Sequence, residues 1–238
     1  MAIARVAVGT LATATSGNMV PGLPAGWQAD DIHYLACISE NGDSFTATGW
    51  SHVAGSPLNN ATLNTSLSVL WRRAVAGDTA PTVGTATGGS ACRITGYSGC
   101  ITTGTPHDTP TTNTGTTLTA TWLSLDPSDT AAMVIAFLGI ESQFSSATVS
   151  GYSGTNPTFS EAFDSENTAG SNWVTVAVAD GTNDGAATGD RTATIAATTT
   201  AFWCALMLSL IPAAGAAAGQ PYVKRIGGIP GMGNRRIW

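Results

Sequence analysis

The stretch Ala201-Phe-Trp-Cys-Ala-Leu-Met-Leu-Ser-Leu-Ile211 decides the fold. It is apolar at nearly every position, yet it is shorter than the roughly 18 residues that span a bilayer. A continuous apolar run of this length is typical of a strand that is buried on both faces. Ala131-Ala-Met-Val-Ile-Ala-Phe-Leu138 has the same character. The two runs therefore predict central strands of a buried β-sheet.

Strand patterns continue on both sides of these runs. In the segment 66–74, Leu67, Val69 and Trp71 fall on one face because side chains alternate along a strand. The other strong candidates are 32–38, 172–178 and 191–196, and the weaker ones are 3–8, 44–50, 91–97 and 117–122. Helical periodicity with caps is absent from the sequence, and Gly, Asn, Asp, Ser and Pro clusters separate the segments. We expect an all-β protein, an antiparallel β-sandwich or jelly roll of roughly ten strands with an extended C-terminal arm.

The domain organisation changes after residue 211. We expect a β-sandwich domain at 1–211, a linker of small residues at 212–220 and an extended docking arm at 221–238. Glycine and proline recur in the arm, so it can sustain neither a helix nor a long ladder of hydrogen bonds. It also carries several large apolar side chains, which disordered tails rarely do. The composition favours an arm that binds a partner.

Charge divides the chain in the same place. The last nineteen residues hold four basic residues and no acidic residue, which gives +4. The rest carries five arginines against fifteen acidic residues, or −10, and the two values give the net charge of −6. The predicted docking residues combine apolar anchors and cations: Tyr222, Lys224, Arg225, Ile229, Arg235, Arg236 and Trp238.

The composition also indicates which classes of partner to expect. An acidic body disfavours nucleic acid, because each phosphate contact needs a Lys or Arg. We expect no membrane insertion, and the N-terminus lacks the pattern of a signal peptide, so synthesis in the cytoplasm is expected. Charged residues make up only 10% of the chain, and so sparse a charge favours surfaces that neighbouring copies cover. We expect a homo-oligomer, with a trimer as the specific expectation.

Catalytic patterns are weak. His33 falls in a predicted strand, while His52 and His107 fall near turns, and a structural role is expected for each. A paired-carboxylate glycosidase site would have to come from Glu141, Glu161, Asp164 and Glu166, which we expect in a solvated loop. We therefore predict that the protein is not an enzyme and that it has no catalytic residue and no cofactor.

Two further groups leave alternatives open. The loop from Asp180 to Asp190 carries several oxygen ligands, as calcium sites do, but Asn-Asp-Gly sequences also build turns without an ion. We expect no metal there. Cys92 and Cys100 could form a disulfide, whereas free thiols are the expectation for a cytoplasmic protein. Cys37 and Cys204 lie in apolar segments and should be buried.

Aromatic residues offer a different function. An exposed Trp or Tyr can stack on a sugar ring, whereas a buried one fills a core. Trp71, Trp173 and Trp203 lie in strand patterns, so we expect them in the core. Trp50 and Tyr152 border loops, and they support the alternative of a carbohydrate- or host-receptor-binding module with a host-surface glycan as partner.

Several segments resemble phage-encoded β-sandwich proteins of the tail or accessory type. The resemblance is carried by Asp30-Asp31-Ile-His-Tyr-Leu-Ala-Cys-Ile, Thr48-Gly49-Trp50, Leu67-Ser-Val-Leu-Trp-Arg-Arg-Ala74 with Asp78 and Pro81, Arg93-Ile-Thr-Gly-Tyr97, Ala201-Phe-Trp-Cys-Ala-Leu-Met-Leu-Ser-Leu and Pro221-Tyr-Val-Lys-Arg-Ile-Gly-Gly. It implies a jelly-roll-like sandwich and a location in the virion, with other phage structural proteins as partners. We thus expect a tail-tip, fibre or accessory component, with capsid head decoration as the alternative.

Overall fold

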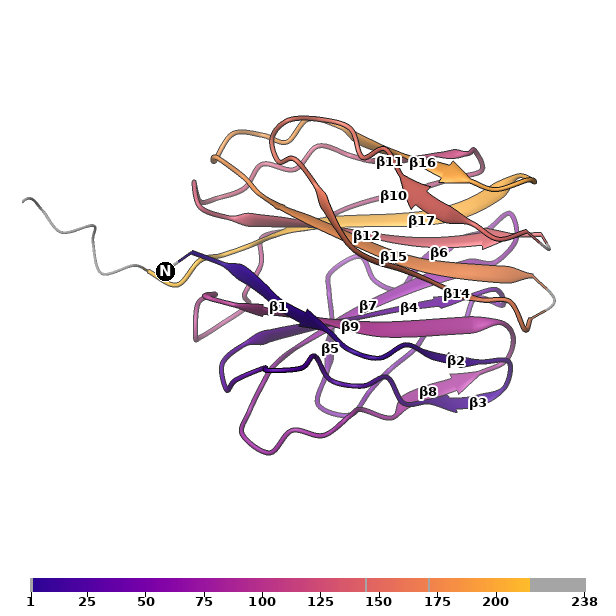
Figure 1. Cartoon of the computed structure of the whole chain (residues 1–238), viewed down its shortest axis with the longest axis horizontal. Coiled ribbons are helices and arrows are strands. Elements are labelled where there is room, and N and C mark those ends of the chain that lie inside the picture. Colours follow the sequence, from indigo (N-terminus) through magenta and orange to yellow (C-terminus); the bar gives the residue numbers. More distant parts are fainter. Residues whose placement is uncertain (1, 144, 171, 215–238) are drawn as a thin grey trace, which may run out of the picture.

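The computed structural model describes residues 2–143, 145–170 and 172–214 (Figure 1). These residues form seventeen β-strands and no helix: β1 Ala4–Val8, β2 Ala12–Ala14, β3 Gly17–Met19, β4 Ile32–Ser39, β5 Ser51–His52, β6 Leu58–Asn60, β7 Thr65–Arg73, β8 Val83–Ala86, β9 Ser90–Ser98, β10 Thr111–Gly115, β11 Thr119–Trp122, β12 Met133–Ser142, β13 Thr148–Ser150, β14 Ser160–Asn167, β15 Trp173–Thr182, β16 Arg191–Ala196 and β17 Ala201–Leu210. The prediction of an all-β sandwich is therefore confirmed.

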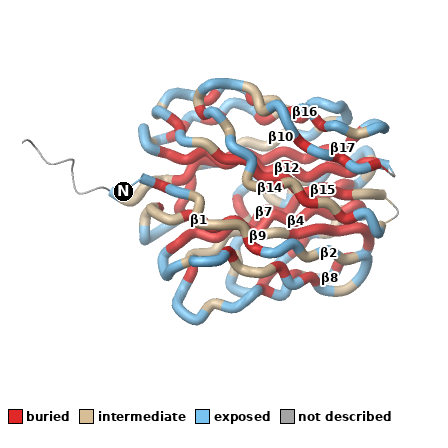
Figure 2. The backbone as a smooth tube through the Cα atoms, viewed as in Figure 1, coloured by how far each residue is buried: buried red, intermediate tan, exposed pale blue. Residues whose placement is uncertain are grey.

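Four antiparallel sheets stack into layers (Figure 1). The two central layers are a seven-stranded sheet, ordered β1-β9-β4-β7-β5 with β2 beside β9 and β6 beside β7, and a five-stranded sheet, ordered β10-β17-β12-β15-β14. The small sheet β3-β8 covers the outer face of the first, and β11-β16-β13 covers the outer face of the second. Burial accordingly concentrates in the middle of the stack, with exposed residues in the loops (Figure 2).

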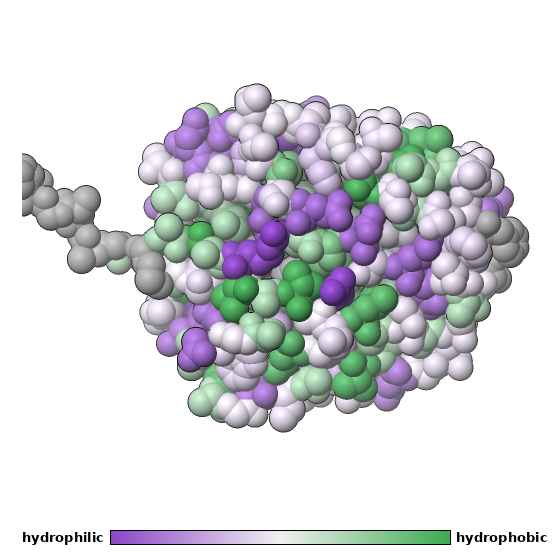
Figure 3. Space-filling model, in the orientation of Figure 1, coloured by the Kyte–Doolittle hydropathy of each residue, from purple (hydrophilic) through white to green (hydrophobic). Residues whose placement is uncertain are grey.

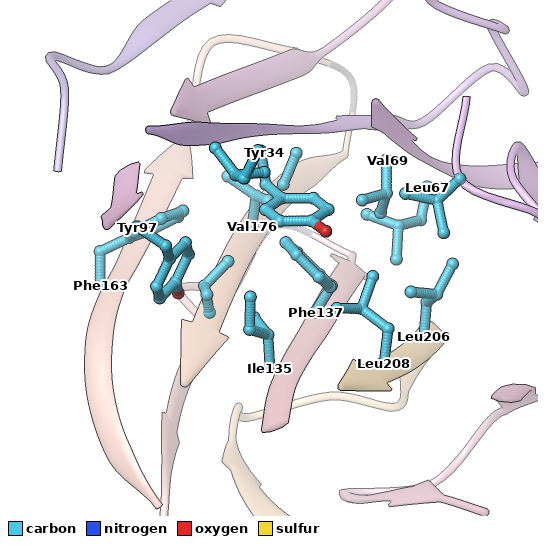
Figure 4. Close-up of a cluster of buried hydrophobic side chains, with 14 of the residues drawn as sticks. Tyr34, Leu67, Val69, Tyr97, Ile135, Phe137, Phe163, Val176, Leu206 and Leu208 are labelled. Atoms are coloured by element: carbon cyan, nitrogen blue, oxygen red, sulfur yellow. The ribbon is translucent and has the colours of Figure 1, made fainter. Parts of the chain in front are cut away.

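Strand alternation explains why the central strands look continuously apolar. In β12, Ile135 and Phe137 face the seven-stranded sheet, whereas Leu138 and Ile140 face the outer three-stranded sheet. The central core between the two large sheets holds Tyr34, Leu67, Val69 and Tyr97 on one side, and Ile135, Phe137, Phe163, Val176, Leu206 and Leu208 on the other (Figure 4). Each face of the central strands is thus removed from water by a different layer.

One glycine sets how closely the two large sheets approach. A Cβ atom on Gly139 of β12 would lie 2.5 Å from Cδ1 of Ile38 on β4 and 3.3 Å from Cβ of Leu67 on β7. A real Cβ does not approach another carbon so closely, so any side chain here would push the sheets apart. Packing at this density leaves little room for a larger residue.

Most of the long strands match the predicted segments, but one predicted strand is absent and several strands were not predicted. The segment 44–50 is not a strand; it contributes only the isolated bridge from Ala47 to Val83. The sequence prediction of roughly ten strands missed the short strands β2, β3, β5, β6, β8, β10 and β13, as well as the eight-residue β14. Strands of two to five residues display little recognisable alternation, and β14 is polar at most of its positions.

Candidate functional site

The predicted docking residues Tyr222, Lys224, Arg225, Ile229, Arg235, Arg236 and Trp238 all lie outside the described residues. The structure does show where the segment that carries them leaves the sandwich. Ile211 N–H donates to the Pro106 carbonyl oxygen at 2.9 Å, and Ala213 N–H donates to that of Gly99 at 2.8 Å. Main-chain pairing therefore continues into the first residues of the expected linker.

The exit point lies beside the first strand. Gly99 directly follows β9, whose Ser98 pairs with Ala4 at the start of β1. A Cβ on Gly99 would lie 2.4 Å from the Ala2 carbonyl oxygen, so the two segments are in contact. We call this region the terminal face and define it by β1, Asp30, residues 98–100 and Ala213. In Figure 1 the N-terminus marks its position.

β1 forms one edge of the seven-stranded sheet. It pairs with β9 alone, and a register shift between Arg5 and Ala7 interrupts that pairing. Its other edge has no strand beside it in the described structure, so its main-chain groups can accept another strand. Figure 3 shows apolar side chains gathered over this part of the molecule, next to hydrophilic ones. An edge of this kind is a natural place for a chain to attach.

A cavity of about 320 Å³ opens on the terminal face, and the last described residues border it. Its lining includes Asp30 and Asp31 on one side and Cys100 and Ala213 on the other. Asp31 is buried and accepts the Gln28 N–H at 2.8 Å, whereas Asp30 is exposed. The last described residues before the basic segment therefore lie next to negative charge.

Two of the three histidines lie beside hydroxyl groups of neighbouring side chains. Nδ1 of His107 lies 2.8 Å from the hydroxyl oxygen of Tyr34, and both side chains are buried. Burial lowers the pKa of His107 to about 4, so the ring is neutral at pH 7. His52 lies 3.3 Å from the Ser56 hydroxyl oxygen, and burial lowers its pKa as well. The Ser56 hydroxyl oxygen also accepts the Val69 N–H at 2.7 Å, so it ties the turn to β7.

His33 is the least satisfied of the three. It is fully buried, and neither of its ring nitrogens has a hydrogen-bond partner. Trp50 stacks on it at 6.4 Å and Trp27 meets it edge-on at 5.7 Å between ring centroids. Burial is the main reason why its pKa is lowered. The ring thus serves as a packed aromatic side chain.

The expectation that Glu141, Glu161, Asp164 and Glu166 lie in a solvated loop is wrong. Glu141 belongs to β12 and is fully buried, and the other three lie on the edge strand β14. Asp164 accepts the Val149 N–H, and Glu166 accepts the Ala147 N–H, both at 3.1 Å. These carboxylates attach β14 to the segment that leads into β13 and do not converge on a cavity.

Glu141 instead joins the two large sheets. Its carboxylate accepts the hydroxyl proton of Thr65 on β7, and it accepts the Asn172 side-chain amide at 2.7 Å. The Asn172 main-chain N–H donates to Glu40 at 2.6 Å, which brings a second carboxylate close. Burial, and then the charge of Glu40, raise the pKa of Glu141 to about 7, although the two hydrogen bonds lower it. Sequence reasoning missed this group because its partners come from distant segments.

The loop from Asp180 to Asp190 does not gather its oxygen atoms around one point. Asp180 accepts the Tyr97 hydroxyl proton at 2.9 Å and pairs with Arg5 at 3.1 Å, between the large sheets. Asp184 accepts a hydrogen bond from Asn156, while Asp190 accepts the Ser124 N–H at 2.8 Å. Across the residues that the structure describes, no cluster of three or more His, Cys, Asp or Glu could hold a metal ion.

The aromatic residues are divided between core and surface. Trp203 is buried as predicted, but Trp71 and Trp173 are only partly buried, and Trp122 is buried although its segment gave a weak signal. Tyr152 packs between Trp122 and Phe159 at centroid distances of 6.1 and 6.0 Å. It is partly buried and packs against the outer core.

The four cysteines are free thiols, and all are buried. Burial raises the pKa of Cys100 and of Cys204 to about 12, which makes both thiols poor nucleophiles. Within the described ranges, no helix is long and apolar enough to cross a membrane. The chain matches no protein-family model, no curated protein and no solved structure.

Proposed function

We propose that the protein is a non-enzymatic structural subunit that attaches to neighbouring subunits through residues 221–238. Together with the resemblance of its segments to phage proteins, this makes it a virion component of the tail-tip, fibre or accessory type. The observation that carries this proposal is the division of charge along the chain. Four positive charges follow Ala214 in the sequence, and all fifteen acidic residues belong to the sandwich that precedes it.

Two physical features support attachment at this point. The open edge of β1 can pair with an added strand through main-chain hydrogen bonds, which requires no particular side chain. The attached segment brings Tyr222, Ile229 and Trp238 as anchors, and interface energy concentrates in aromatic and Arg residues. An acidic partner surface, such as a second copy of the sandwich, would attract its cations.

Truncation after Ala214 tests this proposal. We expect the full chain to sediment as a homo-oligomer, a trimer being the specific expectation, and the truncated chain to sediment as a monomer with an unchanged melting temperature. Increasing salt should weaken the assembly of the full chain, because exposed charges are screened. Identical sedimentation of both chains would contradict the docking role, whereas a lower melting temperature after truncation would mean that the segment stabilises its own sandwich.

Capsid head decoration is the alternative location. Immunogold labelling of intact particles separates the two, because label on the tail supports an appendage and label on the head supports decoration. Purified particles that lack the chain in mass spectrometry would contradict both. A role in glycan recognition rests on a different part of the surface, near Arg72 and Arg73.

A further inference from the structure

The strand β7 runs past the end of its neighbour. β5 pairs only with Leu70 and Trp71, so the edge of β7 beyond Trp71 has no strand beside it in the described structure. A cavity of about 250 Å³ opens there, lined by Gly49, Ser51, Trp71, Arg72, Arg73 and Val75. A second cavity, of about 260 Å³, is lined by Thr48, Arg72, Thr79, Ala80, Pro81 and Thr82. Arg72 borders both cavities.

Positive charge concentrates at this place. The sandwich contains five arginines and no lysine, and two of those arginines, Arg72 and Arg73, line the same cavity. The ion pairs among the described residues involve Arg5 and Arg72. Arg73 instead donates to the carbonyl oxygens of Ile101 at 2.6 Å and Gly104 at 3.3 Å. No carboxylate of the described chain neutralises it by direct contact.

The surrounding turns hold the guanidinium of Arg72 in place. Asp78 accepts a hydrogen bond from Arg72, and it also accepts the Val75 N–H at 3.0 Å. Gly49 has a positive φ of 79°, and a Cβ there would lie 3.2 Å from Nη1 of Arg72. A glycine at this position leaves space beside the guanidinium. Arg72 is thus held by Asp78, and the guanidinium of Arg73 is held by the carbonyl oxygens of Ile101 and Gly104. Arg73 is therefore positioned before any ligand arrives, which reduces the entropy lost on binding.

The other lining residues indicate the kind of ligand. The lining supplies hydroxyl groups from Ser51, Thr48, Thr79 and Thr82. The ring of Trp71 packs against the central core and edge-on against His107 at 5.7 Å, and the part of the side chain that stays exposed borders the cavity. Hydroxyl groups suit a polyhydroxylated ring, and a guanidinium suits a carboxylate. The −10 charge of the sandwich opposes a polyanion, and each cavity lies slightly below the roughly 300 Å³ of common ligand pockets. A small ligand with a single anionic group fits these limits.

We propose that the cavity beyond β5 binds an acidic sugar, with Arg73 pairing with its carboxylate and Trp71 contacting its ring. The site adjoins the terminal face, because Arg73 donates to the Ile101 carbonyl oxygen and the Asp30 N–H donates to the Ala74 carbonyl oxygen. Its lining includes none of the residues that define that face, so glucuronate binding can be tested apart from the docking role. Such a site would let a subunit that is attached through its C-terminal segment recognise acidic glycans.

Titration of the full chain with glucuronate, followed by ¹H–¹⁵N NMR, tests the site. We expect shifts of the Ser51 amide and of the Trp71 indole, and no shifts with glucose, which lacks the carboxylate. Arg73→Gln should weaken glucuronate binding at least tenfold, or about 1.4 kcal/mol, because it removes a hydrogen bond between charged groups. Arg93→Gln is the matched control, because Arg93 donates to Gly9 and Ser165 and lies outside the cavity lining.

Several outcomes would overturn the proposal. Equal affinity for glucose would mean that the carboxylate is not recognised, and equal affinity for inorganic phosphate would mean an adventitious ion only. Glucuronate shifts confined to other residues would place binding elsewhere. If Arg73→Gln does not fold, the wild-type shift map decides alone: shifts at the cavity residues support the site, and their absence refutes it.

Discussion

Two buried carboxylates, at opposite ends of β12, join the two large sheets in different ways. Asp180 lies opposite Ile135, near the start of β12, and its partners are the cation of Arg5 and the hydroxyl of Tyr97. Glu141, near the end of β12, has neutral donors and a second carboxylate, Glu40, close by. Burial is the largest cause of a raised pKa in both groups.

The two carboxylates differ in the neighbours that counteract the effect of burial on their pKa values. Arg5 and Tyr97 both lower the pKa of Asp180, so each neighbour named there favours the ionised form. At Glu141 two hydrogen bonds compete with the charge of Glu40, and the pKa still reaches about 7. Neutral donors satisfy the geometry of a carboxylate, but they do not replace a cation in stabilising its charge. The Glu141 end should therefore be the pH-sensitive end of the sandwich.

The largest expected effect comes from the packing between the two ends. Leu206 is fully buried and lies opposite Phe137, in the middle of β12. Leu206→Ala should lower the free energy of unfolding by about 2–5 kcal/mol, from lost burial and a residual cavity. Urea unfolding at pH 5 and pH 8 should give the same loss, since no charge changes. Leu118→Ala is the control, because this side chain is 43% exposed. A loss that depends strongly on pH would show that packing and charge are coupled here.

Glu141→Gln should stabilise the protein above neutral pH. Between about pH 4.5 and 7 the folded protein keeps a proton on Glu141 that the unfolded chain has released, so stability falls as pH rises through this window. The amide should remove this loss, with a gain on the order of 3 kcal/mol at pH 8 and little change at pH 4.5. Asp126→Asn, at an exposed position, is the matched control. If the free energy of unfolding of Glu141→Gln varies with pH as in the wild type, Glu141 is not the source of the pH sensitivity.

Arg5→Met, near Asp180, should destabilise the protein, in contrast to Glu141→Gln. It leaves Asp180 with the Tyr97 hydroxyl and raises the pKa of Asp180 further, because the cation that favours ionisation is gone. We expect a loss of about 1–2 kcal/mol at pH 7, reduced because the Arg5 side chain is 27% exposed. The loss should shrink below about pH 4, where the carboxyl takes up a proton in both states. Stability curves at pH 4 and 7 measure this, and an equal loss at both would mean that Arg5 acts only through packing.

Tyr34→Phe should give the smallest effect and no pH dependence above about pH 5. The hydroxyl of Tyr34 contacts a neutral histidine, because the pKa of His107 is about 4. Removing a neutral hydrogen bond should cost about 1 kcal/mol. Thermal melting at pH 6 and 8 is the measurement. A loss that differs between these pH values would show that His107 carries charge in the folded protein.

The sequence predicts the central strands of the sandwich better than the short strands that cover them. Long apolar runs such as the one in β12 indicate strands that are covered on both faces, and the structure confirms this. The outer sheet β3-β8 could not be predicted, because its strands have only three and four residues, whereas β11 and β16 of the other outer sheet fall in predicted segments. Their pairing depends on contacts made after the chain folds back, and local pattern does not encode such contacts.

The contacts of the buried charged groups were harder to predict from the sequence than the strands. Arg5 and Asp180 are 175 residues apart, and Thr65 and Glu141 are 76 residues apart, so no local spacing links either pair. The sequence around these acids is rich in Ser, Asn and Gly and predicts a loop, whereas Glu141 lies inside a strand and is buried with partners from distant segments. The acidic sandwich and the basic C-terminal segment, in contrast, are visible in composition alone.

The four buried cysteines can report on transient separation of the stacked sheets. Cys37 and Cys92 face each other under the outer sheet β3-β8, whereas Cys204 lies in the central core and Cys100 lies at the terminal face. A thiol reagent can react only when the layer above a cysteine moves away. The order in which the four cysteines are labelled would therefore record which layers separate first as the protein breathes.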